Sequence, residues 1–155
     1  MFRLVRKACN FARRSRFEQA WFLPCWLLLG ISRLVILAVP FRRLAPWLGT
    51  PMATVAWVPL AGLDGEAKAL SIAGIILMAS RYTPWNSDCF PQALTARILL
   101  GFYGIPYCLC FGVDKKTGAE MAAHAWVSAG KVRVSGGEGF GKFTVVGCFV
   151  SSCPL

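Results

Sequence analysis

The order of patterns from Cys89 to Val150 constrains the fold most: one helical pattern comes first, and short apolar runs follow it. Leu94, Ile98 and Phe102 recur at four-residue spacing, which predicts an amphipathic helix beginning at Cys89. Glycines and a proline within 101–106 end this helix. Strands are expected over residues 107–113, 121–128, 131–135 and 143–150. A helix followed by antiparallel strands predicts an α+β domain.

The first half of the chain has a different character. Residues 1–50 are basic and apolar, with helical patterns that break at Pro40 and around residues 49–51. A connector rich in proline and glycine follows, and the Ala-, Ile- and Leu-rich run 67–80 predicts a buried helix. We therefore divide the chain into a helical N-terminal region with its connector, residues 1–66, and a domain of residues 67–155.

Charge and hydropathy in the N-terminal region bear on partners and location. The formal net charge of +10 is concentrated early, which is typical of a solvated basic face or of a surface that meets an anionic partner. No motif supports binding of nucleic acid. Residues 20–39 are apolar, but Arg33 interrupts them, whereas a span needs about 20 uninterrupted apolar residues. We expect a cytoplasmic protein whose helix is buried or peripherally attached to a membrane.

The cysteines predict reduced thiols rather than a disulfide framework. There are seven, an odd number, and they are scattered through apolar sequence. Cys108 and Cys110 would point to the same face of a strand. Because the chain has one histidine and lacks the usual repeated ligand spacing, no metal and no cofactor is expected, and we interpret these two cysteines as small core residues.

Cys89 and His124 are the candidates for chemistry. A cysteine at a helix N-terminus meets the positive end of the helix dipole, which stabilises the thiolate. An imidazole on a neighbouring strand can take the thiol proton and later pass it to a leaving amine. His124 is the chain's only histidine, so acid–base chemistry near neutral pH would run through it. Spacing by itself leaves open a packed histidine and an inert cysteine.

Four segments and an upstream region resemble a known family. They are DCFPQAL at 88–94, GIP at 104–106, FGV at 111–113 and AHAWV at 123–127, with PFRRLAPWLG at 40–49 upstream. Together they resemble the transglutaminase-like cysteine peptidases and, more narrowly, the stand-alone leader peptidases among the lasso peptide biosynthesis B proteins. The resemblance extends from about Phe17 to Phe149.

The resemblance implies a papain/transglutaminase-like core, in which a nucleophile helix packs on an antiparallel sheet, with a helical N-terminal extension. It implies a leader peptidase that cleaves a ribosomally made precursor peptide without ATP. Cys89 would be the nucleophile that forms a thioester, and His124 the general base and acid. The implied partners are the precursor leader peptide, a separate leader-recognition protein and an ATP-dependent lasso cyclase.

The third catalytic position departs from the family pattern. The family places an aspartate on the strand after the histidine, but no aspartate follows Asp114 here. If the hairpin turns at 129–130, Ser135 would lie opposite His124 and accept a bond from its Nδ1–H. Glu138 has the right charge but lies three residues further along. A backbone carbonyl or a water molecule is an equal alternative.

Two residues near Cys89 and His124 have predicted structural roles, and the sequence also leaves two alternative functions open. Asp88 is expected to cap the helix, and Trp126 to pack in the core on the sheet face opposite to His124. The same scaffold could instead carry a Cys–His acyltransferase or amidase. A non-catalytic, membrane-associated scaffold protein, in which Cys89 is incidental, is the other alternative.

Overall fold

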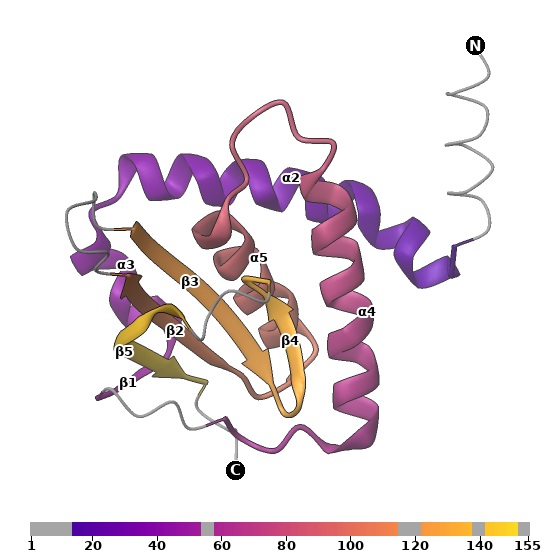
Figure 1. Cartoon of the computed structure of the whole chain (residues 1–155). Coiled ribbons are helices and arrows are strands. Elements are labelled where there is room, and N and C mark those ends of the chain that lie inside the picture. Colours follow the sequence, from indigo (N-terminus) through magenta and orange to yellow (C-terminus); the bar gives the residue numbers. More distant parts are fainter. Residues whose placement is uncertain (1–13, 54–57, 115–121, 138–141, 152–155) are drawn as a thin grey trace.

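The computed structural model describes residues 14–53, 58–114, 122–137 and 142–151 (Figure 1). Four helices and five strands are present in these residues. In chain order they are α2 (Arg16–Ala38), α3 (Phe41–Leu48), β1 (Thr50–Met52), α4 (Gly62–Ser80), α5 (Cys89–Phe102), β2 (Cys108–Asp114), β3 (Ala122–Ala129), β4 (Val132–Ser135) and β5 (Thr144–Val150).

The strands form one antiparallel sheet in the order β1-β5-β2-β3-β4. Figure 1 shows α5 lying behind the strands, α2 crossing the top and α4 running beside β4. The predicted α+β class is confirmed, and the four predicted strands are each present within one residue of their expected limits. The short strand β1 was not predicted, because Pro51 and its neighbouring glycine read as a connector.

The main core lies between the helices and one face of the sheet. Buried residues of α4 and α5, such as Ile72 and Leu100, meet Leu109 and Val127 of the sheet. Because side chains alternate along a strand, Leu109 of β2 and Val127 of β3 point toward the helices. Cys110 and Trp126 point to the other face of the sheet. The sheet therefore has apolar side chains on both faces.

Residues of the N-terminal region enter the same core. Cys25 and Leu29 of α2 and Leu48 of α3 are completely buried within it. Ser15 and Glu18 start α2 with a reciprocal capping box, in which each side chain bonds the other residue's main-chain amide. Helix α4 begins at Gly62, upstream of the predicted residue 67. The division between residues 66 and 67 remains a prediction.

Candidate active site

Cys89 is the first residue of α5, and its side chain is half-buried. Asp88 occupies the N-cap position as expected, but its side chain makes no capping hydrogen bond. The first amides of a helix have no partner within it, and Pro91 has no amide hydrogen. The main-chain N–H groups of Cys89 and Phe90 are thus available beside the thiol, at the positive end of the helix dipole.

A network of hydrogen bonds holds the loop that leads into Cys89. The Gln92 side chain donates to the Ser87 carbonyl over 2.7 Å. Thr83 Oγ1 lies 2.9 Å from Ser87 Oγ and 3.1 Å from the Trp85 carbonyl oxygen. The Trp85 ring packs on Trp26 of α2, with the ring centroids 4.6 Å apart. The long helix α2 therefore supports the loop that positions the cysteine.

His124 lies near the start of β3 and is held by a main-chain acceptor. Its Nε2 lies 2.6 Å from the carbonyl oxygen of Gly136. A carbonyl only accepts, so Nε2 carries the proton and Nδ1 of the neutral ring is left with a free lone pair. The ring stacks on Phe143 and on Trp126, at centroid distances of 4.8 Å and 6.0 Å. These contacts orient the imidazole with Nδ1 as its basic atom.

The expectation that Trp126 faces away from His124 is wrong. The two residues are two positions apart on β3, so the alternation of a strand places both side chains on one face. Trp126 is buried, as expected, but in the smaller core on the far side of the sheet from α5.

The elements that carry Cys89 and His124 are neighbours, although their side chains make no hydrogen bond to each other within the described residues. Phe90 packs edge-on against Phe111 at 5.2 Å between ring centroids, and Phe111 pairs with Ala125. This contact brings the first turn of α5 over the residue that follows His124. Cys89 packs against the helix-side core, whereas the His124 ring lies with Trp126 on the other face.

The structure corrects the expected position of Ser135. Ser135 pairs with Val127 and not with His124. The hairpin turns at Gly130 and Lys131 and not at 129–130, which moves the register by two residues, and a bulge next to Val127 moves it by one more. The Ser135 hydroxyl is buried and has no hydrogen-bond partner among the described residues. Glu138 lies outside the described residues. The observed partner of His124 is instead the Gly136 carbonyl, a main-chain group that the sequence left as an unplaced alternative.

An open, mostly apolar cleft of about 550 Å³ lies beside these elements. Leu70, Ala73 and Leu77 of α4 form one wall, and the end of β4 from Ser135 to Gly137 forms another. Gln92, one turn after Cys89, also lines it. The cleft thus connects the first turn of α5 with Gly136, the residue that holds His124.

A comparison of this chain with models of known protein families identifies its superfamily. Residues 35–148 match the model of the transglutaminase-like superfamily. The chain belongs to this superfamily. The matched range includes Cys89, His124 and the whole sheet except the last two residues of β5, so the transglutaminase-like α+β fold expected from the sequence is confirmed. No curated protein and no solved structure matched the chain. Membership of the transglutaminase-like superfamily indicates cysteine-based hydrolase or transferase chemistry.

Proposed function

We propose that this transglutaminase-like protein is a leader peptidase of ribosomal peptide maturation, of the lasso peptide type, with Cys89 as nucleophile and His124 as general base and acid. The observation that carries the proposal is the position of Cys89 at the first residue of α5, in a chain of a cysteine-enzyme superfamily. The sequence segments around Cys89 and His124 support the narrower choice of a leader peptide as substrate.

In this mechanism Nδ1 of His124 takes the proton of the Cys89 thiol. The thiolate attacks the carbonyl carbon of the leader–core peptide bond, and the main-chain amides of Cys89 and Phe90 stabilise the oxyanion. The imidazolium then gives its proton to the leaving amine, and water hydrolyses the thioester. Cys89 packs on the helix side of the sheet and the imidazole lies with Trp126 on the other face, and the two side chains make no hydrogen bond among the described residues. The mechanism therefore requires that the His124 ring turns toward the thiol when the peptide binds.

The third catalytic part is assigned to the Gly136 carbonyl, which accepts the Nε2 proton and so keeps Nδ1 available as the base. Ser135 and Glu138 remain the side-chain candidates. Ser135 is one of the residues that line the cleft, but its hydroxyl is buried and has no hydrogen-bond partner among the described residues, so it makes no contact with the imidazole.

Partners are proposed on the same basis. The precursor peptide would lie in the cleft between α4 and β4, presented by a separate recognition protein, and an ATP-dependent cyclase would use the product.

Helix α2 is the one described helix that is long and apolar enough to cross a membrane. It also packs on the core through Cys25 and Leu29, which favours peripheral contact of its outer face with a membrane, at the cytoplasmic side.

The test is cleavage of the precursor peptide, followed by mass spectrometry, with the recognition protein present and ATP absent. We expect site-specific loss of the leader by the wild-type protein, and a fall in rate of about a thousandfold or more for Cys89→Ala and His124→Ala. Cys25→Ala, a buried cysteine of α2, is the matched control and should retain cleavage. Unchanged cleavage by Cys89→Ala would exclude the nucleophile and favour a non-catalytic scaffold.

An added amine separates hydrolysis from acyl transfer. With methylamine in the reaction, a peptidase yields the leader with a free carboxylate, because water resolves the thioester. A product whose mass shows incorporated methylamine as the main species would instead assign the protein as an acyltransferase on the same fold.

A further inference from the structure

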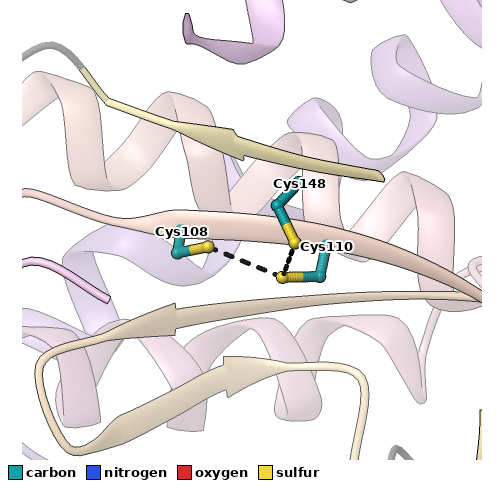
Figure 2. Close-up of side chains that lie close together, drawn as sticks. All are labelled: Cys108, Cys110 and Cys148. Carbon is teal, nitrogen blue, oxygen red and sulfur yellow. Dashed lines mark hydrogen bonds between the residues drawn. The ribbon is translucent and has the colours of Figure 1, made fainter. Parts of the chain in front are cut away.

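Three buried cysteines converge on the sheet face that lies away from α5. Cys108 and Cys110 come from β2, and Cys148 comes from β5 (Figure 2). Cys110 Sγ lies 2.8 Å from Cys148 Sγ and 3.5 Å from Cys108 Sγ. All three sulfurs lie within 4.8 Å of one another. Each residue is no more than 2% exposed.

The fold explains this convergence. Cys108 and Cys110 are two apart on a strand and so share a face, and the ladder pairs Cys110 directly with Cys148. Trp126 and Val150 are buried beside the thiols, and Val58, Phe143 and Val145 pack around them. The peptidase mechanism uses none of the three cysteines, because Cys89 packs on the other side of the sheet.

Three cysteine sulfurs as ligands favour one class of metal ion, the soft cations. A metal about 2.3 Å from each of three sulfurs spaces those sulfurs about 4 Å apart. The sulfurs lie within 4.8 Å of one another, and the two shorter separations, 2.8 Å and 3.5 Å, would widen by about 1 Å or less when the ion binds. Thiolate donors favour soft cations such as Cu(I) and Zn(II). Zn(II) takes four ligands, and the described residues offer three sulfurs and no fourth donor within the cluster. Burial also leaves little room for a water ligand.

We propose that Cys108, Cys110 and Cys148 form a site for one Cu(I) ion in three-coordinate sulfur ligation. Each sulfur that binds as a thiolate releases its proton to solvent, and copper stays in the same oxidation state. The ion would join β2 to β5 at the centre of the sheet.

The alternative to a metal site is a disulfide between Cys110 and Cys148, formed with a peroxide as the oxidant. It would use two of the sulfurs and leave the third without a role.

The test is an anaerobic titration of the reduced full-length protein with Cu(I), in competition with a chromophoric Cu(I) chelator. We use a background in which Cys9, Cys89 and Cys153 are serine, so that the cluster and Cys25 are the remaining thiols. We expect one equivalent bound, a rise in melting temperature, and at least a hundredfold loss of affinity in Cys110→Ser and in Cys148→Ser. Cys25→Ala is the matched buried control and should bind as the background does.

Circular dichroism establishes that each variant is folded, and Cys108→Ala provides a second variant of the site if a serine variant fails to fold. Equal Cu(I) affinity in the cluster variants would overturn the proposal. So would the absence of binding to the reduced background protein, or a preference of the same site for Zn(II) over Cu(I). None of these measurements depends on peptidase activity, so this site and the proposed function can fail separately.

Discussion

His124 donates through Nε2 to the carbonyl of Gly136 over 2.6 Å, and this bond joins the start of β3 to the turn that follows β4. Gly136 has a φ of 96°, a conformation that other residues rarely adopt. A glycine therefore places the main-chain group that accepts from the imidazole. The orientation of the imidazole depends on the conformation of this turn.

Gly136→Ala is expected to impair both stability and cleavage. A Cβ atom at Gly136 would overlap Cβ of Trp126 and would lie 2.9 Å from the Ala125 carbonyl oxygen. We expect a loss of about 2–3 kcal/mol in the free energy of unfolding, measured by urea denaturation, and a lower kcat as the carbonyl moves from Nε2. Gly137→Ala is the matched control: its φ is 62°, but nothing lies within 4 Å of the new Cβ, so about 1 kcal/mol should be lost with kcat retained. Equal kcat losses in both variants would contradict this role of Gly136.

Gly30→Ala is expected to disturb the loop before Cys89 from a distance. The new Cβ on α2 would lie 2.8 Å from Cζ2 of Trp85, so the indole ring must shift. We expect a slower reaction of Cys89 with an alkylating peptide probe and a lower kcat. Gly74→Ala in α4 is the matched control, because its nearest neighbour is 3.6 Å away and helix propensity favours alanine by about 1 kcal/mol. If both variants react like the wild type, α2 does not position the loop.

The buried thiol of Cys25 is expected to make the protein sensitive to alkali. Burial raises the pKa of Cys25 from 9.0 to about 12 in the folded state. Below pH 9 the thiol is neutral in both states, and above it the unfolded chain ionises first, so the free energy of unfolding falls as pH rises toward 12. The contribution is up to about 4 kcal/mol over this range. Denaturation between pH 8 and pH 11 should show a smaller decline for Cys25→Ala than for the wild type; identical slopes would contradict the assignment.

The outer face of α2 is expected to bind anionic membranes. Five apolar side chains at helical spacing are exposed there: Leu23, Leu27, Ile31, Leu34 and Leu37. Arginines flank them at residues 14 and 16 and at 42 and 43, which favours anionic headgroups. In vesicle flotation, we expect the double variant Leu34→Ser, Leu37→Ser to lower the bound fraction about tenfold. Leu63→Ser, a leucine of α4 that is even more exposed, should have no effect, and equal binding to neutral vesicles would argue against the charge contribution.

Much of the site could be anticipated because its parts are local in sequence. The helix that begins at Cys89 follows from the spacing of Leu94, Ile98 and Phe102, and the strand that carries His124 is present where its pattern predicted it. The partner of His124 could not be anticipated in the same way. The hairpin turns one residue later than expected and a bulge follows in its ladder, so Ser135 pairs with Val127 and the Gly136 carbonyl bonds the imidazole.

Local periodicity and turn residues thus determined the helices, four of the five strands and the α+β order, since these depend on neighbours within a few residues. Cys108 and Cys110 could be assigned to one face from alternation along a strand. Only the tertiary structure decided that Cys148 joins them, because the pairing of β2 with β5 brings together residues 38 positions apart. It also decided that the His124 ring lies on the far face from Cys89, since that depends on which face of the sheet the helices cover.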